Sequence, residues 1–232
     1  ISLAISDQTA AAIAAKTGRS STVLPVPIAH ASSSPASTHR VHFLTVGRPV
    51  PKKGYRTLRA AIEQINEPRR WTVVGAHEDE VGGFMPGLTA LGPVPFQVIE
   101  SVYEAGVDVF ALACCKAPDG DVDGVPVAIL EAMARGVAVV STDVGAIGDV
   151  LIHNETGLLV PSGDSAALAD ALNRLVADPA LRHRLGRRGR ERMQNTRSVS
   201  KHAAALLKHC ESVAGLDRDP KKTLAENSFQ PR

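Results

Sequence analysis

Apolar strands and amphipathic helices alternate along most of the chain, and this alternation restricts its fold more than any other feature. The run Val-Ala-Val-Val at residues 137–140 is typical of a strand buried on both faces. A helix over residues 54–65 is predicted by an apolar stripe at helical spacing, formed by Leu58, Ala61, Ile62 and Ile65. Repeated units of this kind predict an α/β fold with a doubly wound, mostly parallel sheet. Such sheets bind ligands at the carboxyl ends of their strands.

The pattern of elements divides the chain into five parts, which are residues 1–27, 28–39, 40–195, 196–215 and 216–232. The first part predicts a short strand, a helix capped by Asp7 and a strand at 22–26. The second is rich in Ser, Ala and Pro and predicts a linker. The third holds the predicted sheet, the fourth an apolar helical stripe, and the polar last part is expected to be mobile.

The predicted strands of the third part cover residues 41–46, 71–75, 88–91, 107–113, 137–141 and 156–160, and its predicted helices cover 54–65, 96–105, 127–134 and 164–177. Helical character continues over residues 179–193. A sheet followed by helices therefore predicts an α/β domain with a helical C-terminal extension.

Composition and charge exclude several classes of protein. The net charge of +2 on 232 residues gives no broad basic field for nucleic acid or anionic lipid. No apolar stretch approaches the roughly 18–20 residues that a membrane span needs. Cys114, Cys115 and Cys210 lack metal-ligand or disulfide spacing, so we assign no metal and expect reduced thiols in the cytoplasm. The chain opens on Ile1 without a signal-peptide pattern, and we expect a processed product or a fragment.

Two carboxylates, Asp123 and Glu131, bracket the start of a helix within residues 114–145. Glycines make the preceding loop pliable, Pro126 suits a first helical turn, and a helix N-terminus favours an anion. Glu131 is a suitable acceptor for a pair of hydroxyls, so a phosphorylated sugar or nucleotide fits this loop. The alternative is structural: Asp123 caps the helix and Glu131 pairs with a nearby Arg or Lys.

A basic loop, GRPVPKKG at residues 47–54, joins a predicted strand to a predicted helix. Gly47 allows close approach of backbone, while Arg48 and Lys53 place two cations at the carboxyl edge of the sheet, where a diphosphate could lie. A solvated basic turn is the alternative. Neither the dinucleotide-binding glycine motif nor the P-loop motif occurs.

Arginines are dense over residues 179–193. A solvated helix face accounts for them, because Glu191 interrupts the run and no aromatic residue lies within it. Peripheral contact with an anionic membrane is the main alternative. A nucleic-acid partner is not expected.

Four motifs of the chain resemble those of a known enzyme family. GRPVPKKG, LTALGPV (88–94), DGVPVAILEAMARGVAVVSTDVGAIGDVL (123–151) and TGLLVPSGD (156–164) occur in the order and spacing of the carboxy-terminal domain of retaining GT-B glycosyltransferases. The resemblance covers about residues 41–195. Residues 1–27 are similar to the end of that family's amino-terminal domain, so most of the acceptor-binding domain is expected to be missing from this chain.

The resemblance implies a role for each motif. Arg48 and Lys53 would hold the donor diphosphate, and Glu131 would accept hydrogen bonds from ribose. The donor base would lie against a backbone segment, Gly92, Pro93 and Val94, and the sugar or phosphate would lie near Asp123 and the start of the helix, Gly124, Val125, Pro126 and Val127. The implied donor is a UDP- or GDP-linked sugar, the acceptor is a saccharide or a lipid-linked sugar, and no cofactor is required.

Two positions depart from the family pattern. Asp123 replaces the usual Glu at the first carboxylate of the E-x7-E motif, which puts sugar selectivity in question. Gly148-Asp149 replaces the common Pro-Glu, which affects the local loop. The rival functions are a non-catalytic nucleotide- or protein-binding module and a sugar-nucleotide epimerase or hydrolase of the same architecture.

Overall fold

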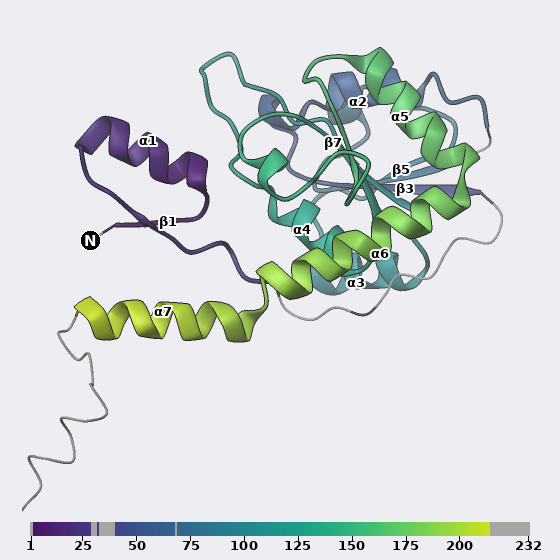
Figure 1. Cartoon of the computed structure of the whole chain (residues 1–232). Helices are drawn as coiled ribbons and strands as arrows, with labels where there is room; N and C mark the ends of the chain where they lie inside the picture. The colour runs from purple at the N-terminus through teal and green to yellow at the C-terminus, as the bar shows by residue number, and fades with distance from the viewer. Residues whose placement is uncertain (1, 29–31, 33–39, 68, 214–232) are drawn as a thin grey trace, which may run out of the picture.

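A six-stranded parallel sheet forms the centre of the molecule (Figure 1). The computed structural model describes residues 2–28, 32, 40–67 and 69–213. The sheet order is β5-β4-β3-β6-β7-β8, and every neighbouring pair is parallel. Its strands are β3 (Val41–Val46), β4 (Arg69–Val74), β5 (Leu88–Ala90), β6 (Val109–Leu112), β7 (Ala138–Thr142) and β8 (Leu158–Val160). The predicted α/β class with a doubly wound parallel sheet is confirmed.

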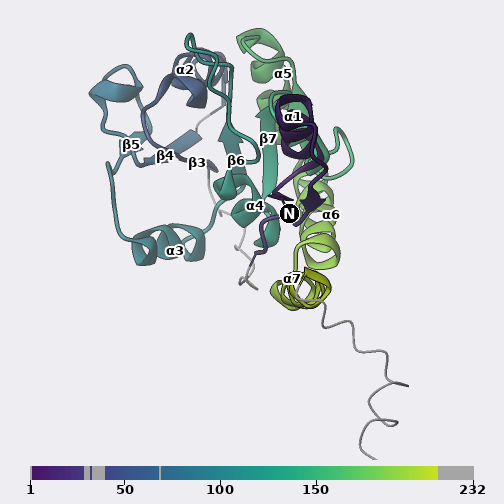
Figure 2. The same ribbon diagram turned by 90° about the vertical axis from the view of Figure 1, so that its left-hand side faces the viewer.

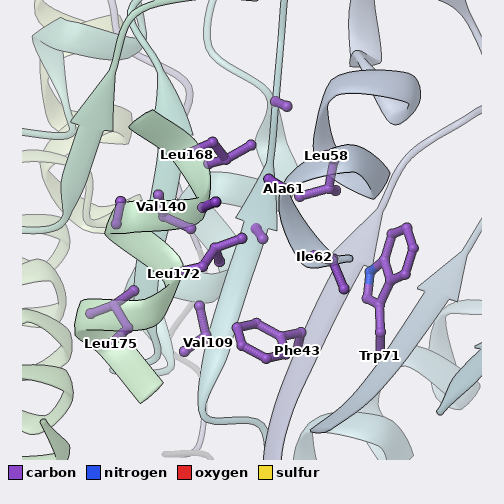
Figure 3. Close-up of a cluster of buried hydrophobic side chains, with 14 of the residues drawn as sticks. Phe43, Leu58, Ala61, Ile62, Trp71, Val109, Val140, Leu168, Leu172 and Leu175 are labelled. Atoms are coloured by element: carbon purple, nitrogen blue, oxygen red, sulfur yellow. The ribbon is translucent and has the colours of Figure 1, made fainter. Parts of the chain in front are cut away.

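Helices cover both faces of the sheet. On one face α2 (Tyr55–Ile62) packs beside α5 (Ser165–Ala177), and the side chains between them and the sheet include Phe43, Trp71 and Leu172 (Figure 3). On the other face lie α3 (Phe96–Glu104) and α4 (Val127–Ala134), with α6 (Pro179–Thr196) against α4. Strands buried on both faces explain the unbroken apolar runs of the sequence.

The direction of the sheet reverses between β3 and β6. From β3 the chain passes to β4 and β5, crosses through α3 to the other side of β3, and continues through β6, β7 and β8. The chain therefore leaves β3 toward α2 on one face and leaves β6 toward α4 on the other. In sheets of this order, ligands bind at the carboxyl ends of the two strands where the direction reverses.

A small β-α-β unit precedes the sheet, made of β1 (Leu3–Ala4), α1 (Asp7–Thr17) and β2 (Thr22–Val23). The predicted cap was wrong: the Ser6 hydroxyl accepts a hydrogen bond from the Thr9 amide, and Asp7 is already inside the helix. The strand expected at 22–26 has two residues. Figure 2 shows this unit beside the sheet, on the side where α6 and α7 (Val199–Val213) lie.

The segment that follows β2 contacts the residue after α6 and the first turn of α7. The Ile28 amide donates a hydrogen bond to the Arg197 carbonyl at 2.8 Å, and Nδ1 of His202, in α7, lies 2.9 Å from the Pro25 carbonyl. The first residue of the predicted linker is thus bonded to the end of α6. Most of the linker, 29–31 and 33–39, and the predicted mobile tail, 216–232, lie outside the described residues.

The arginines of α6 serve different purposes. Arg182 donates to the carbonyls of Leu175 and Val176, and Arg192 donates to the Asp149 carbonyl at 2.7 Å, so both tie α6 to neighbouring segments. Arg187 instead pairs with Glu191 within the exposed face, at 2.9 Å. None of the described helices has the length and hydropathy needed to cross a bilayer.

Candidate functional site

Two lysines and two aspartates form a charged cluster at the carboxyl ends of β3 and β6. Lys53 Nζ lies 2.9 Å from Asp123 Oδ2, so the structure brings together two residues that the sequence assigned to one site. Lys52 Nζ lies 2.8 Å from Asp121 Oδ2 and 3.5 Å from Asp123 Oδ1. The Lys53 and Asp123 side chains are only 14% and 16% exposed, which limits solvent screening of their attraction.

The loop at residues 47–54 that carries Lys52 and Lys53, the lysine loop, is fixed by two backbone contacts with the segment that follows β6. A short 3₁₀ turn, η1 (Pro51–Lys53), ends at Gly54, which has a φ of +62° and lies so close to the Ala113 carbonyl that a β-carbon would overlap it. The Cys115 amide donates to the Lys52 carbonyl at 2.9 Å. Helix α2 consequently begins at Tyr55, one residue after the start at Gly54 that the periodicity predicts.

Gly47 directly follows β3 and lies next to the side chain of Lys53. The Tyr55 hydroxyl donates to the Gly47 carbonyl at 2.6 Å, and a β-carbon on Gly47 would lie 3.5 Å from Cδ of Lys53. The methylene chain of Lys53 therefore runs across the end of β3, with its ammonium directed to Asp123. Arg48, the next residue, is exposed and forms no ion pair with any described residue.

The loop between β6 and α4 that carries Asp121 and Asp123, the aspartate loop, contacts the segment that follows β7. The Ala146 amide donates to the Gly124 carbonyl at 3.0 Å, and a β-carbon on Gly145 would lie 2.0 Å from the Asp123 carbonyl. Val125 is half-buried against the core on the α3–α4 face of the sheet, and Val127 is exposed as the first residue of α4. Pro126 immediately precedes α4 rather than lying in its first turn. Asp123 does not cap α4, because its carboxylate pairs with lysine.

Glu131 lies in α4 and forms no ion pair or side-chain hydrogen bond with any described residue. The predicted alternative, a pair with Arg or Lys, is not found there: the neighbouring Arg135 pairs with Glu100 and lies over the ring of Tyr103. Burial raises the pKa of the Glu131 carboxyl, Arg135 lowers it in part, and Glu100 raises it further. An accessible acceptor of this kind is available to a ligand.

The segment assigned to the donor base lies at the same edge but apart from the cluster. Gly92 follows β5 and is bonded to the end of β4, because its carbonyl accepts from the Gly75 amide at 2.8 Å and its amide donates to the Ala76 carbonyl. Pro93 is exposed, and Val94 is half-buried against the core on the α3–α4 face of the sheet. No hydrogen bond or ion pair of the described residues joins this segment to Lys53 or Asp123.

Lys52, Asp121 and Tyr55 are part of this site and were missed from the sequence. Two signals could have found the ion pairs. Lys52 is adjacent to Lys53, and Asp121 and Asp123 alternate, which puts them on one side of an extended segment. The link from Tyr55 to Gly47 has no signal in the sequence.

Two cysteines, Cys114 and Cys115, lie near the cluster. Burial raises the pKa of Cys114 to about 12, although Lys53 lowers it in part, and burial also raises the pKa of Cys115. Thiolates are the form that attacks substrates and binds metals, and these shifts favour the thiol form at both residues. Within the described parts of the chain, no group of three or more His, Cys, Asp or Glu residues could hold a metal ion.

Comparisons with known proteins agree with this architecture. The chain is 48% identical over 149 residues to the amylovoran biosynthesis glycosyltransferase AmsK of Erwinia amylovora, a match that covers 58% of this chain and 36% of AmsK. The sucrose-phosphate synthase of Thermosynechococcus elongatus superposes with a TM-score of 0.77 and 25% identity, covering 93% of this chain and 58% of that one. Anabaena HepE in complex with UDP-glucose has a TM-score of 0.76 and 18% identity, covering 90% and 63%.

The chain thus spans little more than a third of AmsK and less than two thirds of either solved protein. The model of the family described as glycosyl transferases group 1 matches residues 40–178. That range contains both loops of the charged cluster and all six strands of the sheet. Since it also makes up more than half of the 232 residues, the chain belongs to the group 1 glycosyl transferases.

Proposed function

We propose that this chain is the donor-binding part of a retaining glycosyltransferase, which transfers a hexose from a nucleoside diphosphate sugar to a saccharide or lipid-linked acceptor. The observation that carries the proposal is the Lys53–Asp123 pair, placed where the sheet reverses direction. In this proposal residues 40–195 form the donor domain, and residues 1–27 are the last elements of an amino-terminal domain that holds the acceptor.

The cations would stabilise the leaving group. As the bond between the sugar and the diphosphate breaks, negative charge grows on the phosphate oxygens, and Arg48 and Lys53 would neutralise it. The departing phosphate would help to remove the proton of the attacking acceptor hydroxyl, on the same face of the sugar. Asp123 and the amides of Gly124 and Val125 would face the transferred sugar. Positive side chains thus supply the charge stabilisation, and no cofactor is needed.

The nucleoside would lie against Glu131 and the segment that follows β5. Glu131 has a carboxylate without a described partner, which suits it to the two ribose hydroxyls. The backbone of Gly92, Pro93 and Val94 would line the base. The UDP-glucose complex of Anabaena HepE supports a nucleotide-sugar donor, because that protein shares the fold. The name of AmsK, an amylovoran biosynthesis glycosyltransferase, supports a role in building a polysaccharide.

Calorimetric titration of the chain with UDP, GDP, ADP and inorganic pyrophosphate tests this proposal. We expect one nucleoside diphosphate to bind more tightly than the others and more tightly than pyrophosphate, because base and ribose contacts add to those of the phosphates. A folded chain that binds none of the four contradicts the proposal. Adding back an amino-terminal half then separates a transferase, which turns over, from a non-catalytic binding module, which does not.

Glu131→Ala should weaken the preferred nucleoside diphosphate by about tenfold or more, the usual effect of losing hydrogen bonds to a charged group. Pyrophosphate affinity should stay unchanged, because pyrophosphate has no ribose. Glu155→Ala, which removes an exposed carboxylate elsewhere, is the matched control. Equal loss of both ligands in Glu131→Ala contradicts the ribose assignment.

A further inference from the structure

Lys52 has no role in the site as described so far, although it pairs with both aspartates of the cluster. Its ammonium lies between two carboxylates, 2.8 Å from Asp121 and 3.5 Å from Asp123. Among the residues that the structure describes, Lys53 has one carboxylate partner, Asp123, at 2.9 Å. Asp123 is therefore shared by two lysines. It pairs with the Lys53 ammonium, which the proposed function assigns to the diphosphate.

A bound diphosphate changes the balance of this cluster. Its oxygens compete with Asp123 for Lys53, and they add negative charge beside a carboxylate that is only 16% exposed. A carboxylate that loses its cation in such a place is destabilised by poor solvation and by repulsion from the phosphates. The site therefore needs a second cation that stays with Asp123.

We propose that Lys52 is a positioning residue, which retains Asp123 and so frees Lys53 to bind the diphosphate. This inference rests on the proposed function. Lys52 is fixed at both ends, because its carbonyl accepts from the Cys115 amide and its ammonium is bonded to Asp121. The hydrogen bond to Asp121 and the nearby Asp123 raise the pKa of Lys52 despite some desolvation, so it stays charged. Asp121 thus holds the Lys52 ammonium beside Asp123.

The alternatives predict different behaviour. If Lys52 contacts phosphate directly, its removal weakens binding whether or not Asp123 is charged. If Lys52 only supports the loop, its removal lowers stability without a specific effect on affinity. Only if Lys52 holds Asp123 does the effect of removing Lys52 on ligand affinity depend on the charge of Asp123.

A double-mutant cycle on the whole chain, with inorganic pyrophosphate and UDP or GDP as probes, measures this dependence. Lys52→Met should weaken binding roughly fivefold, the upper range for one exposed ion pair. Asp123→Asn should tighten binding, because Lys53 loses its competing anion. Lys52→Met/Asp123→Asn should bind like Asp123→Asn alone. Lys52→Arg should preserve wild-type affinity, and Lys116→Met is the control for loss of a nearby exposed charge.

Three results would overturn the inference. A loss of equal factor in both backgrounds makes Lys52 a direct phosphate ligand. Unchanged affinity in Lys52→Met, with a lowered melting temperature, makes it structural. Failure of the wild type to bind pyrophosphate or either nucleotide removes the proposed function itself, and the inference falls with it.

Discussion

Gly54→Ala should destabilise the chain by about 3 kcal/mol or more, a large effect for the addition of one methyl group. Alanine in the left-handed region, at a φ of +62°, is unfavourable by roughly 1–2 kcal/mol. The new β-carbon would also lie 1.8 Å from the Ala113 carbonyl oxygen and 2.8 Å from its carbon, and backbone cannot turn aside as a side chain can. Overpacking of this kind adds roughly 1–3 kcal/mol. Urea denaturation measures the loss.

Gly163→Ala is the matched control. Gly163 also has a positive φ, +81°, but nothing lies within 4 Å of the position of its β-carbon. Gly163→Ala should lower the free energy of unfolding by roughly 1–2 kcal/mol, from backbone strain alone. Equal losses at the two positions would show that the contact between the lysine loop and β6 has no importance for stability.

The fold could be predicted from the sequence because its signals are local. Each apolar strand and each amphipathic helix carries its own periodicity, and a repeated strand–helix alternation leaves few arrangements other than a parallel sheet. Element ends were less accurate. The strand expected at 107–113 spans Val109–Leu112, and the helix expected from Gly54 begins one residue later. Ends depend on caps and tight turns, such as Ser6 in place of Asp7, which periodicity does not resolve.

The site was predictable in its location and less so in its contacts. Lys53 and Asp123 are 70 residues apart, but each follows a strand at the point where the sheet reverses, so topology brings them together. Asp121 pairs with Lys52 rather than Lys53, and this choice depends on side-chain directions that the sequence does not determine. The same is true of Glu131, whose candidate partner Arg135 is turned to Glu100 instead.

The support of the two loops is separate from the charged contacts between them. The two loops are held by backbone packing, at Gly54 and Gly145, rather than by the charges themselves. The charged side chains can therefore exchange partners without moving the loops. That separation of support from chemistry suits a site in which a lysine must exchange a carboxylate for a phosphate.

Arg48→Ala/Lys53→Ala should weaken UDP, GDP and pyrophosphate alike, by about a hundredfold or more, because each cation lost removes a charge-assisted hydrogen bond to phosphate. Folding should survive, since Lys52 still pairs with Asp123 and Arg48 is exposed. The matched control is Arg184→Ala/Arg188→Ala, which removes two exposed charges from α6 and should bind as the wild type does. A folded Arg48→Ala/Lys53→Ala variant that keeps its pyrophosphate affinity would place the diphosphate elsewhere. Selective loss of one nucleotide would instead assign these side chains to the base, because a diphosphate contact cannot distinguish uracil from guanine.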